Sequence, residues 1–523
     1  MALSSLQSTT GRWTMAAIIL ASAMAFIDST ALNVALPSIQ NAFHAEATDL
    51  FWLLNSYLLI LAALVMPGGS LGDKLGRKKM FMIGIVIFML ASAACGMAPD
   101  INYLIVFRAI QGIGGALMIP GSLSILTTSF KTSERGKAIG TWSAVTTIVT
   151  VGGPILGGAL ADAGWWRVIF FINIPIGVVS LFILWKKVPE SKDNASAKQL
   201  DYAGAFSITT ALALLTFGFL RIPEAGMYAT EVLTSLLLGT AAFVLFIILE
   251  YKVKAPMMPL QLFANRTFSG TNLLTFFLYG GLFSGILFLT LNMVQIQGYS
   301  QLQAGLTLLP FTILLIVVSR WSGSLVDRFG PRWFLIGGPL VVAVGLLMLS
   351  FVNETKGPSS YFTSYFPGIC VFGLGMSFTV TPLTTTVMGA LANHYSGTAS
   401  GINNALTRIS NVFANAILGA VAIVVYDAYL SQSIDSISLS EKQKTEVLAQ
   451  AKNLGDAHVP TNISKRDHAT IATAYRKSFL HTYSLVMRIS AALSLTAAAM
   501  AFLFINNDAI KSNNDDNNHN DFG

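Results

Sequence analysis

The segment GSLGDKLGRK at residues 69–78 is polar and glycine-rich, and it lies between two long apolar runs. It recurs as GSLVDRFGPR at residues 323–332, an offset of 254 residues. A set of three glycines recurs as well, at an offset of 261, with Gly136, Gly140 and Gly158 corresponding to Gly397, Gly401 and Gly419. Such self-similarity at a nearly fixed offset indicates that the chain contains two copies of one structural unit. Because both copies of the polar segment follow equivalent apolar runs, the two units are parallel repeats.

Apolar residues dominate the chain on both sides of these segments. Of the 523 residues, 54% are hydrophobic and 11% are charged, whereas a soluble domain carries about 25% charged residues. This composition excludes an ordinary soluble enzyme. The two cysteines and six histidines show no metal-binding spacing, so we expect no metal site and no cofactor. The net charge of +7 resides in short segments between apolar runs, so we expect no nucleic-acid partner.

The apolar runs are long enough to cross a bilayer, whose core of about 30 Å needs about 20 residues of helix. An even number of spans puts both ends of the chain on one side of the membrane. With both ends in the cytoplasm, 18 of the 32 Lys and Arg residues lie in cytoplasmic segments, as the positive-inside rule requires. We predict fourteen transmembrane helices at 13–36, 51–70, 80–98, 101–128, 138–161, 168–185, 203–220, 230–250, 268–292, 304–325, 333–351, 362–388, 403–427 and 483–505.

The predicted fold class is therefore an all-α integral membrane protein. The long loop on the outer side of the membrane, residues 428–482, includes a Lys- and Glu-rich segment at 437–454, which favours a short surface helix. We expect a cytoplasmic N-terminus at 1–12, a six-helix bundle at 13–185, a linker with two inserted helices at 186–267, a second six-helix bundle at 268–506 that includes the outer loop 428–482, and a disordered cytoplasmic tail at 507–523.

One acidic residue, Asp28, lies deep inside a predicted span. Asp28 and Arg108 are nine and seven residues from the outer ends of their helices, which places them roughly 13 and 10 Å below the outer surface. A charge at this depth is costly and is by default functional. We predict that the two residues pair, and that a change in their separation alters the proton affinity of Asp28. A static ion pair joining two helices is the alternative.

The repeated polar segment places an acid and several bases between helix ends, and contacts between them would keep one face of the molecule closed until they break. The predicted conformational gate consists of Gly69, Asp73, Gly76, Arg77, Asp327 and Arg328. Polar side chains on one face of the 403–427 helix indicate either a wet cavity or a hydrogen-bond ladder between helices. The candidate cavity residues are Asn404, Arg408, Asn411 and Asn415 on that face, with Asn33, Trp52, Asn55, Tyr57 and Asn292 on other helices.

The sequence resembles the major facilitator superfamily over residues 12 to about 506. The segment 69–78 resembles the loop 2–3 signature of that superfamily, and residues 104–115 resemble its helix 4 motif. The residues Gly153, Pro154, Gly157 and Gly158 are similar to the helix 5 motif of antiporters. Segments 28–37 and 166–177 resemble the fourteen-helix drug:proton antiporter family, whose members carry out multidrug efflux.

This resemblance implies two six-helix bundles related by pseudo-two-fold symmetry, with two inserted helices between them. It also implies that Asp28 is the proton site, that Arg108 modulates it, and that the helix 5 motif is a hinge or seal that favours export. Relatives that export lipophilic cations often hold further acids in the second half. No acid lies well inside the spans 304–325, 403–427 and 483–505, which makes neutral or weakly acidic amphiphiles plausible substrates.

We therefore expect a secondary transporter, and no enzyme, that exports hydrophobic or amphiphilic small molecules such as drugs and antibiotics in exchange for protons. The absence of a GxxxxGK[ST] segment disfavours an ATP-driven pump. We expect a monomer in the lipid bilayer of a bacterial inner membrane, with the proton gradient as its energy source. The alternatives are an exporter of one metabolite, siderophore or lipid, and a membrane-embedded sensor or binding protein. Whether a periplasmic adaptor binds the 428–482 loop stays open.

Overall fold

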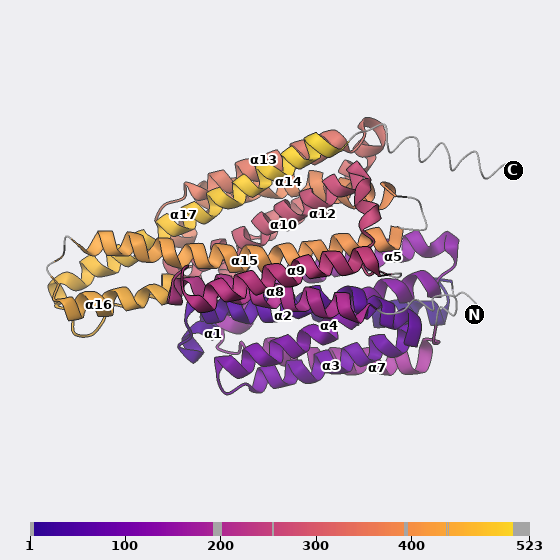
Figure 1. Cartoon of the computed structure of the whole chain (residues 1–523), viewed down its shortest axis with the longest axis horizontal. Coiled ribbons are helices and arrows are strands. Elements are labelled where there is room, and N and C mark those ends of the chain that lie inside the picture. Colours follow the sequence, from indigo (N-terminus) through magenta and orange to yellow (C-terminus); the bar gives the residue numbers. More distant parts are fainter. Residues whose placement is uncertain are drawn as a thin grey trace. The chain divides into compact units, whose positions relative to one another are not determined.

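The computed structural model describes residues 5–191, 201–253, 256–391, 396–435, 437 and 439–505, and they form helices joined by short connections (Figure 1). Within these residues, thirteen helices are long and apolar enough to span a membrane. The remaining predicted span, 138–161, lies within α5 (Thr132–Asp162). Each predicted span thus corresponds to one helix or to two consecutive helices, which confirms the all-helical membrane fold.

The chain divides into two compact units. Unit 1 is formed by the described residues of Met1–His44, Trp52–Gly218 and Leu233–Met258, and unit 2 by those of Ala45–Phe51, Phe219–Val232 and Pro259–Gly523. The helices up to the unit boundary at Met258 are α1 (Thr9–Phe43), α2 (Ala47–Leu75), α3 (Arg77–Met97), α4 (Ile101–Ser129), α5, α6 (Val168–Phe171), α7 (Asn173–Lys187), α8 (Tyr202–Ala225) and α9 (Thr230–Lys252). The later helices are η1 (Leu260–Ala264), α10 (Arg266–Leu291), the π-helical turn η2 (Asn292–Ile296), α11 (Gln301–Thr307), α12 (Leu309–Phe329), α13 (Arg332–Ser350), η3 (Gly357–Ser360), α14 (Tyr361–Gly389), α15 (Ser396–Ile434), α16 (Glu441–Ala449), η5 (Gln450–Asp456) and α17 (Lys465–Phe504).

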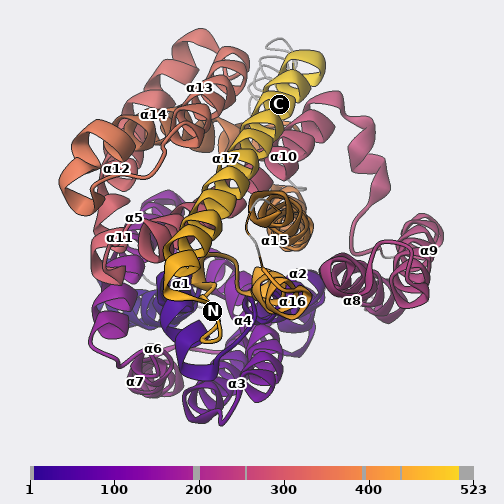
Figure 2. The same ribbon diagram turned by 90° about the vertical axis from the view of Figure 1, so that its left-hand side faces the viewer.

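The two units repeat the same helix packing. In unit 1, α3 packs against α4, and α1 packs against α5 and α7. In unit 2, α13 packs against α14, and α10 packs against α15 and α17. The helices α8 and α9 have no counterpart in this correspondence and lie side by side in Figures 1 and 2. The repeat that the sequence predicts is therefore present in the tertiary structure, with α8 and α9 as the inserted pair.

One helix crossing shows how closely the repeat is preserved. A Cβ atom added to Gly84 of α3 would lie 3.0 Å from the carbonyl oxygen of Gly114 on α4. The same atom added to Gly338 of α13 would lie 3.0 Å from the carbonyl oxygen of Gly375 on α14. These residues correspond at the offsets of 254 and 261 found in the sequence. Small residues let membrane helices approach closely, so the glycines set the same short separation in both units.

Several helices differ in their ends from the predicted spans. The predicted span 168–185 is divided into α6 and α7, and the span 304–325 is divided into α11 and α12. In unit 2, α15 continues to Ile434 and α17 already begins at Lys465, so the connection between them is 435–464 and not 428–482. Hydropathy detects only the apolar length of a helix, whereas a polar helix continues readily into water, where side chains and solvent satisfy its ends.

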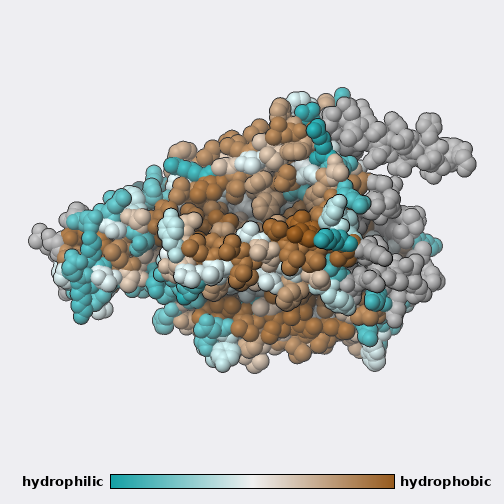
Figure 3. Space-filling view, in the orientation of Figure 1, coloured by the Kyte–Doolittle hydropathy of each residue, from teal (hydrophilic) through white to brown (hydrophobic). Residues whose placement is uncertain are grey.

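The connection 435–464 contains the short helix expected from its composition. The helix α16 begins with a capping box in which Ser440 and Gln443 satisfy each other's backbone N–H groups. The hydroxyl of Tyr475 on α17 donates to the carbonyl oxygen of Val447 at 3.1 Å and holds α16 against α17. Figure 3 shows hydrophilic residues gathered over α16 and the adjoining ends of α15 and α17. This polar extension of unit 2 begins where the apolar helix surfaces end.

Candidate functional site

The centre of the candidate site is a buried ion pair between α1 and α4. Arg108 donates from Nη1 to Oδ2 of Asp28, and the two side chains are 1% and 0% exposed. The predicted pairing of these residues is thus confirmed. The pairing was predictable because the rise per residue of a helix is constant. Asp28 and Arg108 are at similar residue counts from the predicted outer ends of their spans, and they therefore lie at a similar depth.

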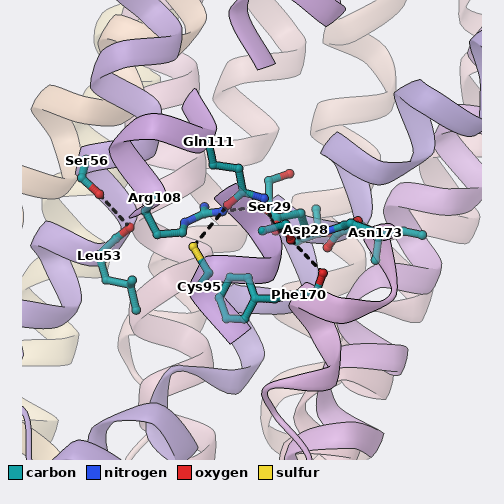
Figure 4. A network of polar contacts seen from close by, with 12 residues as sticks. Asp28, Ser29, Leu53, Ser56, Cys95, Arg108, Gln111, Phe170 and Asn173 are labelled. Carbon is teal, nitrogen blue, oxygen red and sulfur yellow. Dashed lines mark hydrogen bonds and ion pairs between the residues drawn. The ribbon is translucent and has the colours of Figure 1, made fainter. Parts of the chain in front are cut away.

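A network of amides completes the hydrogen bonding of Asp28 (Figure 4). Gln111 donates from Nε2 to Oδ1 of Asp28 at 3.0 Å and accepts from Nη1 of Arg108 at 2.8 Å. Asn173 on α7 donates to the same Oδ1 at 3.4 Å and to Oγ of Ser92 at 2.9 Å. Both carboxylate oxygens therefore face N–H donors. This arrangement matches an ionised carboxylate, which can only accept hydrogen bonds.

Sequence reasoning did not assign Gln111, Asn173 or Ser92 to the site. Gln111 lies one helical turn after Arg108 and so on the same face of α4, which is a signal that could have identified it. Asn173 of α7 lies in the segment 166–177 that resembles the antiporter family, whereas Ser92 of α3 lies in no such segment. Tyr57 was predicted as a cavity residue, but its ring lies under the guanidinium of Arg108, 4.3 Å from ring centroid to Cζ. This cation–π contact makes Tyr57 part of the ion-pair site.

The predicted antiporter motif contacts the helix that carries Asp28. A Cβ atom on Gly157 of α5 would lie 2.7 Å from Cα of Ala31, and one on Gly153 would lie 3.0 Å from Cβ of Thr30. Pro154 lies within α5 between these contacts, and Gly158 is buried. The motif glycines thus bring α5 close to α1, at residues two to three positions beyond Asp28.

The first copy of the predicted gate is a sharp turn closed by an acid from outside the motif. Gly76 separates α2 from α3 with φ of +119°, a conformation that favours glycine. The carboxylate of Glu190 accepts from the backbone N–H groups of Lys78 and Lys79, both at 3.0 Å. Arg77 donates its backbone N–H to the carbonyl oxygen of Ser191 at 2.9 Å. The segment after α7 thus caps the N-terminus of α3, where a negative charge is favourable.

The remaining predicted gate residues lie in α2, next to α4, and at the C-terminal end of α12. A Cβ atom on Gly69 would lie 3.4 Å from Cβ of Pro120 on α4. In the second copy, the exposed Arg328 lies over the ring of Phe329, and Gly330 has φ of +78°. The side chains of Asp73 and Asp327 lie outside the described part of the structure.

The candidate cavity residues of α15 are partly joined to each other. Asn415 donates to Oδ1 of Asn411 at 2.8 Å and accepts from Ser284 of α10 at 3.4 Å, and both asparagines are buried. Arg408 is half-buried and Asn404 is exposed. At Asn411 and Asn415 this polar face is therefore a hydrogen-bond ladder to α10. At Asn404 and Arg408 its side chains are exposed or half-buried in unit 2.

The other candidate cavity residues lie on α1, on α2 and in the π-helical turn η2. Asn55 of α2 is fully buried, and both of its amide atoms have no partner among the described residues. Asn33 and Trp52 are half-buried, and the Trp52 ring lies 6.3 Å from that of Phe217. Asn292 in the π-helical turn of unit 2 donates to the hydroxyl of Tyr365 at 2.8 Å.

Residues 18–415 match the family model described as Major Facilitator Superfamily. The chain belongs to the major facilitator superfamily. It is thus a multi-pass membrane transporter of small molecules, and the two packed repeats described above are the units of that fold. No group of three or more His, Cys, Asp or Glu side chains that could hold a metal ion occurs in the residues described.

Two relatives of this major facilitator chain match nearly its whole length. The multidrug resistance protein Stp of Mycobacterium tuberculosis is 33% identical over 494 residues, which cover 92% of this chain and 88% of that protein. The tetracenomycin C resistance and export protein of Streptomyces glaucescens is 29% identical over 493 residues, covering 93% of this chain and 90% of that protein.

Solved structures of major facilitator transporters share the fold. A bacterial homologue of the human lysosomal transporter Spinster has a TM-score of 0.61 at 18% identity, with 95% of this chain and 98% of that chain covered. The xylose transporter XylE from E. coli has a TM-score of 0.57 at 15% identity, with 94% and 96% covered. At these identities the likeness shows the fold alone.

Proposed function

We propose that this protein exports hydrophobic or amphiphilic small molecules in exchange for protons, with Asp28 as the proton-binding group and Arg108 as its modulator. The observation that carries the proposal is the environment of Asp28, whose two oxygens are fully buried and face N–H donors from two neighbouring helices. The naming of relatives as multidrug resistance and export proteins supports export as the direction of transport.

Protonation of Asp28 conflicts with the hydrogen bonds that now surround it. A protonated carboxyl group has an O–H donor, which cannot face the N–H donors of Arg108 or Gln111 without losing a hydrogen bond. The unpaired charge of Arg108 would also be costly in its buried position. Proton binding therefore favours a different arrangement of α1 and α4, and proton release favours the arrangement described here.

Movement of Asp28 can be transmitted because α1 is joined to its neighbours over its length. Its backbone contacts α5 at Gly153 and Gly157. Its carbonyl oxygen at Ala17 accepts from the hydroxyl of Ser180 on α7 at 2.9 Å. Closely packed helices do not deform continuously but shift between discrete packings. We infer that a proton-dependent shift of α1 moves α5 and α7, which would couple proton binding to alternating access.

The decisive experiment uses the purified protein in proteoliposomes with an imposed pH gradient and a fluorescent hydrophobic substrate. Asp28→Asn keeps the size of the side chain but removes its titration, so gradient-driven transport should be lost. Glu354→Gln is the matched control, because Glu354 is an exposed acid whose ion pair with Arg476 lies outside the buried network. Undiminished gradient-driven transport by Asp28→Asn would refute the assignment.

A second candidate is an exporter dedicated to one compound, which is favoured by the relative named for tetracenomycin C resistance and export. The two candidates differ in substrate range. A panel of structurally unrelated amphiphiles should each compete with the fluorescent substrate if the protein is a multidrug exporter. Competition by a single chemical class would favour the dedicated exporter.

A further inference from the structure

Two carboxyl groups face each other at one end of the α8–α9 hairpin, far from Asp28 in the sequence. Asp201 directly precedes α8, and Glu250 lies in the last turn of α9. The side chains are 8% and 2% exposed. The two helices lie side by side in Figures 1 and 2, and a Cβ atom on Gly218 of α8 would lie 2.7 Å from the Leu236 side chain of α9. The transport mechanism proposed above makes no use of this pair.

Each carboxyl group has one oxygen bound to the backbone and one that is not. Asp201 accepts at Oδ1 from the N–H of Gly204 at 2.7 Å, and Glu250 accepts at Oε2 from the N–H of Met258 at 2.9 Å. The other two oxygens, Oδ2 and Oε1, are buried and have no N–H or O–H donor among the described residues. Both adjoin Gly204, because a Cβ atom there would touch Oδ2 and lie 2.9 Å from Oε1. Both free oxygens thus border the same Cβ position, which places the two carboxyl groups side by side.

Two ionised carboxylates cannot make this contact, because a carboxylate oxygen accepts hydrogen bonds and donates none. The charges around the pair do not compensate for a double negative charge. In the described structure neither residue forms an ion pair. Lys252 follows on the same turn but is exposed, and Lys198 and Lys254 lie outside the described residues. Among the described residues, the polar groups that face the pair are the backbone N–H groups of Gly204, Met257 and Met258.

A metal cation fits this arrangement poorly. Calcium takes six to eight oxygen ligands and magnesium requires an octahedron, whereas two free carboxyl oxygens converge here among the residues that the structure describes. Backbone N–H donors, which repel cations, occupy the remaining oxygens. A single proton shared between the two free oxygens satisfies both, because the protonated oxygen then donates to the other.

We propose that Asp201 and Glu250 bind one proton between them and form a pH-sensitive clasp. The clasp joins the start of α8 to the end of α9 and, through Met258, to the point where the chain leaves unit 1. Two buried carboxylates this close cannot both ionise without strong repulsion. Loss of the proton to water therefore opens the clasp and loosens the end of the hairpin. The proposal does not depend on Asp28 being the coupling site.

The test measures thermal unfolding of the full-length protein in lipid nanodiscs from mildly acidic to mildly alkaline pH. Glu250→Gln and Asp201→Asn each supply an amide N–H in place of the shared proton while keeping the acceptor for the backbone. The melting temperature of the wild-type protein should fall as pH rises, and each variant should lose more than half of that shift. Glu231→Gln, which alters an exposed acid at the other end of the hairpin, should keep the wild-type profile.

Infrared difference spectra between acidic and alkaline pH provide a second readout. The wild-type protein should show a carbonyl band of a protonated carboxyl group that is absent from both amide variants. A wild-type pH profile in both Glu250→Gln and Asp201→Asn would overturn the proposal. Stabilisation of the wild-type protein, but not of the variants, by sodium, magnesium or calcium at constant pH would overturn it in favour of a metal cation.

Discussion

Replacing Gly157 by Ala tests whether the packing of α5 on α1 controls transport. The new Cβ atom would lie 2.7 Å from Cα of Ala31 and 2.8 Å from its carbonyl carbon, whereas carbon atoms in contact are about 3.5–4.0 Å apart. The two helices must therefore separate by roughly 1 Å at this level. Overpacking of this kind costs about 1–3 kcal/mol, and the higher helix propensity of Ala offsets about 1 kcal/mol of that cost.

The displacement also reaches the ion-pair site, since Ala31 is three residues from Asp28 on the same helix. The hydrogen bonds of Asp28 to Gln111 and Asn173 already measure 3.0 and 3.4 Å, so a shift of this size would break at least one of them. A misplacement of about 1 Å in a reactive site can lower its rate roughly a hundredfold. We expect gradient-driven transport by Gly157→Ala to fall at least tenfold, which is about 1.4 kcal/mol in activation free energy.

The assay combines transport in proteoliposomes with thermal unfolding of the purified protein. Gly152→Ala is the matched control, because this glycine is on the same helix, is exposed, and its added Cβ atom would meet nothing within 4 Å. The control should be as stable as the wild-type protein or slightly more stable, with unchanged transport. If Gly157→Ala matches Gly152→Ala in both measurements, the contact between α1 and α5 does not transmit the shift of Asp28.

Three further substitutions test other parts of the site. Glu190→Ala removes the acceptor for two backbone N–H groups at the start of α3 and should cost about 0.5–2 kcal/mol; kcat should fall with little change in KM, and a rise in KM alone would contradict a gating role. Ser92→Ala removes one of the two acceptors of the Asn173 amide and leaves the carbonyl oxygen of Phe170 without the hydroxyl donor. It should lower stability by about 1–3 kcal/mol, and an unchanged melting temperature would count against the network. Arg408→Ala should weaken transport of an anionic substrate more than that of a cationic one, and equal effects would remove the charge preference.

The contacts that the sequence could predict are those set by helix geometry. The depths of Asp28 and Arg108 follow from counting residues along two helices, and the structure places the two side chains together. The close contact of Gly157 follows from its lack of a side chain, although the sequence does not show that its partner is α1. The sequence did not predict that Glu190 caps the N-terminus of α3. It lies more than 100 residues from Lys78 and Lys79, and no periodic pattern connects a linker acid with the N-terminus of a distant helix.

The second unit shows where hydropathy stops being informative. Residues 428–434 and 465–482 are too polar to read as membrane spans, yet they extend α15 and α17, because a polar helix is stable in water once tertiary packing supports it. The polar face of α15 was likewise open to two interpretations. Asn411 and Asn415 hydrogen-bond to each other, and Asn415 accepts from Ser284. These contacts depend on where α10 lies.

The sequence by itself determined that the chain is a membrane protein with two repeated units, and that one acid lies deep in a span. These properties depend on local composition and on the constant rise of a helix. Only the tertiary structure decided which groups surround that acid, and that two further acids meet at the end of the inserted hairpin. Those arrangements depend on contacts between side chains from separate helices, which no local pattern encodes.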